Sequence, residues 1–224
     1  MVFKKTRWQH KTILLAVVIL VLVSTKGFLY YAFFVDVSRL KKENPGTTGF
    51  IDFRVKQWQK QGRPVRIEYI WLPITEISPE AINAVVGKED NSFWSNKGYI
   101  LKGIIRAAKR NIRSRGYKYG ASTISQQLAR NIYLAPQKSI SRKIKEVILA
   151  WRIERELPKL RILELYLNTI EWGDGIFGIE AASRFYFFKS ASDLDGEEAK
   201  KLASIIKYPL SNAALKIKYD RAGR

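Results

Sequence analysis

An apolar stretch close to the N-terminus limits how the rest of this chain can fold. Residues 12–23 read TILLAVVILVLV, and after a short polar break the apolar run resumes over residues 28–35. A single helix over 12–35 would be about 36 Å long, enough to cross the hydrocarbon core of a bilayer. Lys26 would cost about 3 kcal/mol at mid-membrane, but it can snorkel if the span ends near it. We therefore expect one transmembrane helix and a domain outside the bilayer.

The residues ahead of this stretch predict its orientation. They include four Lys or Arg side chains and no acid, and basic flanks stay in the cytoplasm. A cleaved signal peptide is the alternative, but the apolar run is long and no A-x-A cleavage site follows it. We expect a retained anchor with the N-terminus in the cytoplasm. The predicted division is a basic tail (1–11), the anchor (12–35), a linker (36–48), a folded domain (49–210) and a basic C-terminal tail (211–224).

Charge and residue content exclude several kinds of site. The 224 residues carry 40 Lys and Arg against 20 Asp and Glu, a formal net charge of +20. This charge implies an anionic partner such as nucleic acid, phospholipid headgroups or a phosphorylated substrate. The chain has no cysteine, and its one histidine, His10, precedes the apolar stretch. Disulfides, a Ser-His-Asp triad and a His-ligated metal in the folded domain are therefore not available.

Helical periodicity and capping signals dominate residues 49–210, which predicts a mainly α fold. The expected helices span 49–61, 79–87, 97–118, a segment starting near Thr123, 139–157, 160–168, 180–186 and 197–206. The helix over 139–157 has an apolar stripe made of Ile140, Ile144, Val147, Ile148 and Trp151. Alternation over 65–72 predicts one short strand.

Two further segments have a distinctive composition. Residues 97–118 hold eight Lys or Arg and no acid around a helical apolar face. That pattern favours contact with anionic lipid or substrate over a merely solvated face. Residues 171–178 contain several glycines and are expected to form a loop. Because no Gly-Lys-Ser/Thr follows, we reject a nucleotide-binding loop there.

The polar run GASTISQQLARN, at 120–131, is a candidate binding segment. Thr123 and Gln126 have capping-box spacing, so a helix is expected to start near Thr123. Ile124 and Leu128 would then face the core. The residues off that stripe are Gln126, Gln127 and Arg130. A helix N-terminus with a nearby hydroxyl and an arginine suits an anion, and the alternative is an ordinary capped surface helix.

Two acids flank this run, Glu89 in EDNSF and Glu146 in RKIKE. Paired carboxylates serve chemistry at an anomeric carbon: one takes a proton from an attacking hydroxyl, and the other acts on the leaving-group side. For Glu146, a surface ion pair with Arg142 is the alternative. Nearby cations suit a diphosphate, because arginine binds it as a fork and lysine as a point charge. These cations are Arg130, Lys138, Arg142 and Lys143.

Together these segments resemble the successive motifs of peptidoglycan glycosyltransferases. The matching motifs are EDNSF (89–93) with Gly98, GASTISQQ (120–127), RKIKE (142–146) and LELYLN (163–168). They occur in the order and approximate spacing of that family, and the resemblance covers about residues 45–210. Residues 171–182, EWGDGIFGIEAA, resemble the monofunctional biosynthetic transglycosylase branch more closely.

The resemblance implies a lysozyme-like, mainly helical glycosyltransferase domain behind one N-terminal transmembrane helix, on the outer face of the cytoplasmic (inner) membrane. It implies that Glu89 deprotonates the 4-hydroxyl of the lipid II acceptor. That oxygen attacks the lipid-linked donor with inversion, which makes a β-1,4 bond and releases undecaprenyl diphosphate. Glu146 matches the second acid. The residues matching donor-site contacts are Ser122, Gln126, Gln127 and Arg130, and those matching the basic group near the diphosphate are Lys138, Arg142 and Lys143.

The chain departs from the family pattern at three places. Asn96 stands where the family usually has histidine, Ile100 stands where it often has aspartate, and Gly120-Ala121 replaces Gly-Gly. Some members are assisted by a divalent metal. With no histidine in the domain we expect no cofactor and no protein-bound metal, and a metal bridging diphosphate and carboxylate stays open. The expected partners are lipid II, the growing glycan, an anionic membrane surface and cell-wall synthesis proteins, but not nucleic acid.

Two other functions stay as alternatives. A lytic transglycosylase or lysozyme-like hydrolase would cleave preformed cell-wall glycan. The basic cluster argues against it, because such an enzyme needs no lipid diphosphate. A membrane-tethered binder of nucleic acid or anionic lipid would depend steeply on salt and not on Glu89 or Glu146. The expected outward topology argues against cytoplasmic nucleic acid.

Overall fold

A computed structural model describes residues 12–16, 18–19, 22, 25–27, 29–30, 34–114, 122–137 and 139–211. The chain divides into two compact units, Met1–Val37 and Ser38–Arg224. Within the described residues, no helix is both long and apolar enough to span a bilayer. The predicted anchor lies partly outside those residues, and the two predicted tails lie almost wholly outside them. All three therefore stay predictions.

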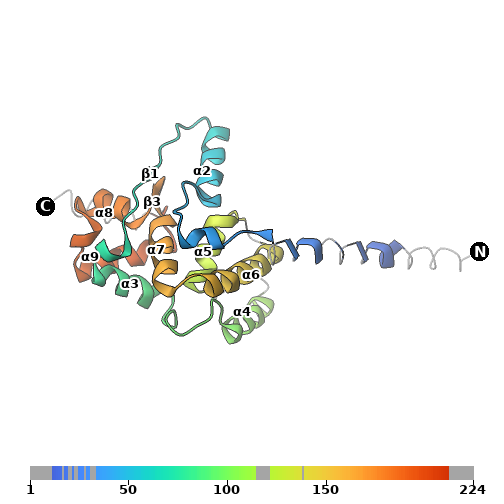
Figure 1. Cartoon of the computed structure of the whole chain (residues 1–224). Coiled ribbons are helices and arrows are strands. Elements are labelled where there is room, and N and C mark those ends of the chain that lie inside the picture. The colour runs from blue at the N-terminus through green and yellow to red at the C-terminus, as the bar shows by residue number, and fades with distance from the viewer. Residues whose placement is uncertain are drawn as a thin grey trace, which may run out of the picture. The chain divides into compact units, whose positions relative to one another are not determined.

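The larger unit is mainly helical, as the sequence predicts (Figure 1). Its α-helices are α2 (Gly49–Lys60), α3 (Pro79–Glu89), α4 (Leu101–Arg113), α5 (Ile124–Tyr133), α6 (Ile140–Glu156), α7 (Lys159–Thr169), α8 (Ile179–Phe187) and α9 (Gly196–Ile205). Short 3-10 helices lie at η2 (Ser38–Lys41), η3 (Ile74–Glu76) and η4 (Ala191–Asp193). Each helix expected from the periodicity is present, with ends that shift by a few residues, and residues 115–118 of the helix expected over 97–118 lie outside the described residues.

Local capping explains where several of these helices begin. The Ser78 hydroxyl accepts the N–H of Ala81 at 3.1 Å in the first turn of α3. Ser139 caps α6 in the same way. Thr123 and Gln126 form the predicted capping box at the start of α5, in which each side chain accepts the other residue's backbone N–H. Capping matters because the N–H groups of a first turn have no partner within the helix.

Residues 171–178, expected to be a loop, instead form a hairpin. The strands are β1 (Glu68–Tyr69), β2 (Glu171–Gly173) and β3 (Ile176–Phe177). β3 lies in the middle, parallel to β1 and antiparallel to β2. Gly175 turns the hairpin at φ 81°, and a Cβ there would lie 2.2 Å from the carbonyl oxygen of Arg66. The strand expected over 65–72 is only two residues long, and strands this short carry almost no period-two pattern.

The helix α5 packs against α2, α6 and α7 (Figure 1). Ile124 and Leu128 are fully buried, as predicted. Gln126, predicted to lie off the buried stripe, is also 0 % exposed, so this expectation was wrong. Burial extends around α5 because other helices surround it, and Gln127 and Arg130 stay half-buried. The candidate binding segment is therefore a central helix of the fold.

The helix α6 is turned so that its apolar stripe faces outward. Ile140 is 65 % exposed, Ile144 is 53 % exposed, and Trp151 is exposed as well. The residues buried on α6 are Glu146, Leu149, Ala150 and Ile153. An apolar stripe ordinarily faces a core, but here the packed face is a different one. Glu146 is carried into the interior as a result.

Residues 38–48, which the sequence places in a linker, belong to the larger unit. Leu40 is buried, and its carbonyl accepts a hydrogen bond of 2.8 Å from Arg161 on α7. Lys41 forms an ion pair with Glu156, at the end of α6, at 2.8 Å. The segment after Val37 is thus packed onto the domain.

Candidate active site

Glu89 is the last residue of α3 and is half-buried at the end of that helix. Its Oε2 accepts a hydrogen bond of 2.8 Å from Nε2 of Gln127 on α5. The amide holds the carboxylate on one side. Since the side chain is not enclosed, the remaining lone pairs can meet a substrate hydroxyl, as a general base requires.

The chain after Glu89 is held by Asp90, a buried carboxylate. Its oxygens accept hydrogen bonds from Nδ2 of Asn96 (2.9 Å), from the hydroxyl of Ser92 (2.9 Å) and from the N–H of Ile124 (3.2 Å). The last contact ties this loop to the first residue of α5. Asn96, one of the departures noted in the sequence, thus has a defined role in this chain: it braces the residue next to Glu89.

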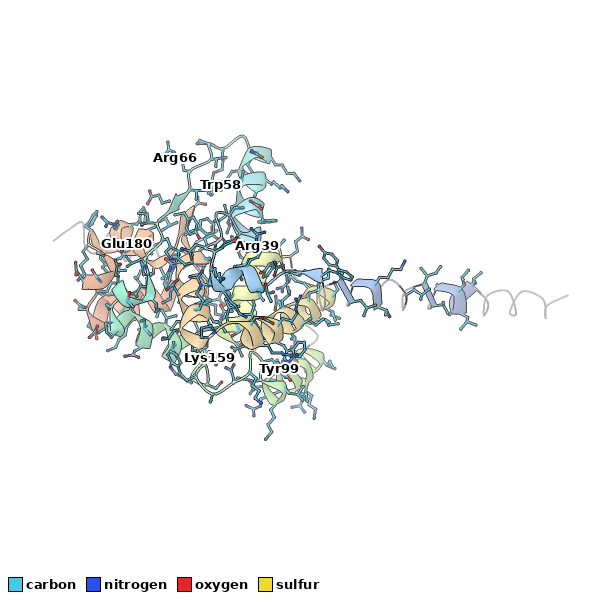
Figure 2. All side chains as sticks on the ribbon, in the orientation of Figure 1. Arg39, Trp58, Arg66, Tyr99, Lys159 and Glu180 are labelled. Atoms are coloured by element: carbon cyan, nitrogen blue, oxygen red, sulfur yellow. The ribbon has the colours of Figure 1, made fainter. Side chains whose placement is uncertain are left out.

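The same loop is braced from α6 and α7. Lys159, labelled in Figure 2 at the start of α7, donates to the carbonyl of Asn96 at 2.8 Å and to Glu154 at 2.7 Å. Glu154 also accepts a hydrogen bond from Ser125 of α5. The Lys159 ammonium lies 4.6 Å from the centre of the Phe93 ring. Residues far apart in the sequence therefore form one support behind Glu89.

Two neighbouring glutamines on α5 have different environments. Gln126 is fully buried and its Oε1 accepts the N–H of Thr123 at 3.2 Å, and its predicted contact with substrate stays a prediction. Gln127 lies between Glu89 and Tyr166, and its Oε1 accepts the Tyr166 hydroxyl at 3.1 Å. Tyr166 lies in the 163–168 motif, but the sequence predicts no role for it.

Arg130 lies on α5 near Glu89 and near the cations Arg142 and Lys143. Burial lowers its pKa, while Tyr166 and Glu89 nearby raise it. Its guanidinium carbon lies 5.6 Å from the centre of the Phe50 ring. Among the described residues, the buried Nε of Arg130 has no hydrogen-bond partner. Because an unsatisfied buried donor is costly, Arg130 suits an acceptor oxygen supplied by a ligand.

Glu146 belongs to a buried ion cluster. It is 2 % exposed, and its carboxylate pairs with Arg142 and, at 3.0 Å, with Lys143. The Lys143 ammonium also donates to the hydroxyl of Ser122 at 2.7 Å. The alternative of a surface ion pair is therefore wrong in its location, although the pair with Arg142 does form.

The cations around Glu146 lie close enough to influence one another. Burial, together with the charges of Arg130 and Arg142, lowers the pKa of Lys143 to about 8. Burial also lowers the pKa of Arg142, and Arg130 adds to that effect. Arg142 and Lys143 pair with one carboxylate and Arg130 acts on both of them, so positive charge is in excess, and an anion such as a diphosphate would neutralise it. Arg130 links this cluster electrostatically to Glu89.

Comparison with known proteins shows which family the chain belongs to. A family model described as Transglycosylase matches residues 57–223. The chain belongs to the transglycosylase family. It is 42% identical over 166 residues to a biosynthetic peptidoglycan transglycosylase of Neisseria gonorrhoeae, spanning 74% of this chain and 71% of that protein. Proteins of the same name from Nitrosomonas eutropha (39% over 191 residues, 85% of this chain, 78% of that protein) and Azoarcus sp. (38% over 203 residues, 91% and 85%) are also similar.

In this member of the transglycosylase family, most of the predicted site residues come together in two linked groups. The first contains Glu89, Gln127 and Arg130, and the second contains Ser122, Arg142, Lys143 and Glu146. Gln126 packs into the helix cap, and Lys138 lies outside the described residues. Among the described residues, no group of three or more His, Cys, Asp or Glu side chains is placed to hold a metal ion.

Proposed function

We propose that this chain is a peptidoglycan glycosyltransferase in cell wall biogenesis. It polymerises lipid II into β-1,4-linked glycan strands, with inversion and release of undecaprenyl diphosphate. Membership of the transglycosylase family and the names of its relatives support the reaction class. The observation that carries the proposal is the site itself: the half-buried Glu89, held by Gln127, lies near Arg130, which acts on the half-buried cations paired with Glu146.

Glu89 is the proposed base. Its carboxylate takes the proton of the acceptor's 4-hydroxyl as that oxygen forms a bond to the anomeric carbon of the donor. The bond from this carbon to the diphosphate oxygen breaks, and its electron pair leaves with the diphosphate. Inversion follows because the hydroxyl enters on the face opposite the leaving group. Gln127 keeps the carboxylate oriented through this step.

The cations are proposed to bind the diphosphate of the donor. Arg130 has an unused N–H, and Arg142 and Lys143 lie beside it. Glu146 acts through these cations: it pairs with Arg142 and Lys143 and so keeps them in place while charge develops on the leaving group. Ser122 positions the Lys143 ammonium. Lys138 remains a predicted member of this group, and no protein-bound cofactor is part of the proposal.

We also propose that the domain is lysozyme-like and works at an anionic membrane surface behind a single N-terminal anchor, outside the cytoplasm. The helix α4 supports the membrane contact. Its apolar residues Leu101, Ile105 and Ile112 are exposed, and so are its cations Lys102, Arg106, Lys109, Arg110 and Arg113. Exposed apolar side chains flanked by lysine and arginine suit the headgroup region of an anionic bilayer.

Polymerisation of purified lipid II in detergent tests the proposed reaction. The protein should form glycan chains that are resolved by gel electrophoresis. Glu89→Gln keeps the size of the side chain but removes the base, and should abolish the polymer. Glu80→Gln, at an exposed position on the same helix, is the matched control and should leave polymer formation unchanged. Polymer made by the E89Q variant would overturn the assignment of the base.

The same preparation discriminates the alternatives. Soluble muropeptides released from isolated cell wall would favour the hydrolase. Salt-sensitive binding of nucleic acid that is indifferent to Glu89 and Glu146 would favour the non-enzymatic binder.

A further inference from the structure

A chain of hydrogen bonds ends at the proposed base and begins on a different helix. The hydroxyl of Tyr166, on α7, donates to Oε1 of Gln127 at 3.1 Å. Nε2 of Gln127, on α5, donates to Oε2 of Glu89 at 2.8 Å. Glu89 ends α3, so three separate helices contribute one side chain each. Tyr166 is fully buried, so its hydroxyl is fixed by packing.

The chemistry of these groups sets the direction of the chain. An ionised carboxylate only accepts hydrogen bonds, so Gln127 must turn its NH₂ group toward Glu89. The amide oxygen then needs a donor on its other side, and the Tyr166 hydroxyl supplies one. A flipped amide would place its oxygen against the carboxylate, and two acceptors would repel each other. Without the hydroxyl, only this repulsion from the carboxylate opposes the flip, and the amide oxygen loses its donor in this chain of three side chains.

The tyrosine is well suited to remain a donor. Burial raises its pKa well above the ordinary value, and the charge of Glu89 raises it further, while Arg130 acts in the opposite direction. The hydroxyl therefore keeps its proton throughout the neutral range. It does not exchange that proton with the base, since Gln127 stands between them.

We propose that Tyr166 is a positioning residue for the transfer reaction: its hydroxyl fixes the orientation of the Gln127 amide, and this amide fixes the Glu89 carboxylate. The inference rests on the proposed role of Glu89 and adds a residue that neither contacts substrate nor belongs to the cation cluster. Its effect must therefore pass through Gln127 and must disappear when the Gln127 amide is absent.

Tyr166→Phe is the direct test, because it removes one oxygen and keeps the buried ring. We expect kcat for lipid II polymerisation to fall about tenfold, as for the loss of one oriented hydrogen bond, with KM changed less than about twofold. Tyr186→Phe is the matched control. Tyr186 is also buried, and its hydroxyl donates to the carbonyl of Trp172 at 2.9 Å, away from Gln127. That variant should lose a similar amount of stability and keep kcat.

A double-mutant cycle separates positioning from a merely structural role. In a Gln127→Ala background, Tyr166→Phe should lower kcat no further, because its effect acts through the missing amide. Independent effects that multiply, or a Y166F variant with the kcat of the parent protein, would overturn the proposal. Rates measured well below the melting temperatures of all variants keep the comparison valid if Y166F is the less stable one.

The activity of the E89Q variant tests the assignment of the base separately from the double-mutant cycle. If E89Q stays active, the proposed base is wrong, whatever the cycle shows. If E89Q is inactive but Tyr166 and Gln127 act independently, only the positioning role fails.

Discussion

The carboxylate of Glu146 lies 3.0 Å from the ammonium of Lys143, one turn earlier on α6, and is almost completely buried. The same ammonium reaches Ser122 at the N-terminal side of α5. Lys143 therefore pairs with the charge of Glu146 and also connects α6 to the residue that lies just before the start of α5. Because a buried charge without its counterion is costly, this relationship makes Glu146 a structural requirement of the cation cluster as well as a candidate for catalysis.

Glu146→Gln should lower both stability and activity. Removing the buried anion leaves Arg142 and Lys143 without their partner, and we expect the free energy of unfolding to fall by about 1 to 3 kcal/mol, since Lys143 is partly exposed. Urea unfolding measures the loss. Glu197→Gln, which removes an exposed ion pair with Lys200, should give no measurable change. Equal stability of the E146Q variant and the parent protein would contradict the buried cluster.

Lipid II binding should weaken above about pH 8, because that is where Lys143 loses its proton in the folded site. KM should rise across this range in the parent protein. Lys143→Arg stays charged and should flatten the rise, whereas Lys201→Arg, at an exposed position on α9, should not. An alkaline rise in KM that is unaltered in the K143R variant would rule out Lys143 as its origin.

The stability contribution of Lys143 should change with pH in the opposite direction. Its pKa is lowered from 10.5 in an unperturbed lysine to about 8 in the folded protein. Between these values the unfolded chain binds more protons, so the contribution of this group to stability rises with pH across that window. Unfolding of the parent protein and the K143R variant is measured at several pH values between 8 and 10.5. The stability of the parent relative to K143R should rise with pH across that window and should not change with pH below it.

Asn96→Ala should loosen the support next to Glu89. The variant loses the hydrogen bonds from Nδ2 to the buried Asp90 carboxylate and from the Gly98 N–H to Oδ1. We expect about 1 to 3 kcal/mol less stability and a lower kcat. Ser95→Ala, in the same loop but bonded only to an exposed carbonyl, is the control and should behave like the parent. Thermal unfolding and the lipid II assay together report both effects.

Because the chain has no cysteine, a single introduced cysteine can be labelled to probe the proposed membrane contact of α4. A single Ile112→Cys labelled with an environment-sensitive fluorophore should shift its emission to the blue on anionic liposomes, because Ile112 is 78 % exposed on the basic helix. Phe188→Cys, at a residue 69 % exposed at the end of α8, should not shift. Equal responses at the two positions would contradict a specific contact by α4.

Helix positions followed from local signals, but helix orientations did not. Periodicity predicted α6 almost residue by residue, yet its apolar stripe faces outward and Glu146 inward. The same holds for Gln126, whose capping-box role was visible in the sequence while its complete burial was not. The hairpin at 171–178 was missed because each of its strands is too short to show alternation, although Asp-Gly is a known hairpin signal.

The residues of the chain by themselves determined the helices, the caps, and the two acids with their basic neighbours, because each signal lies within a few residues. The packing of the helices decided the rest. Tyr166 meets Gln127, 39 residues away, and Gln127 meets Glu89, 38 residues away, only when α7, α5 and α3 come together. Such contacts have no local pattern, since they depend on which face each helix turns toward its neighbours. The same packing placed Glu146 among its cations in the interior.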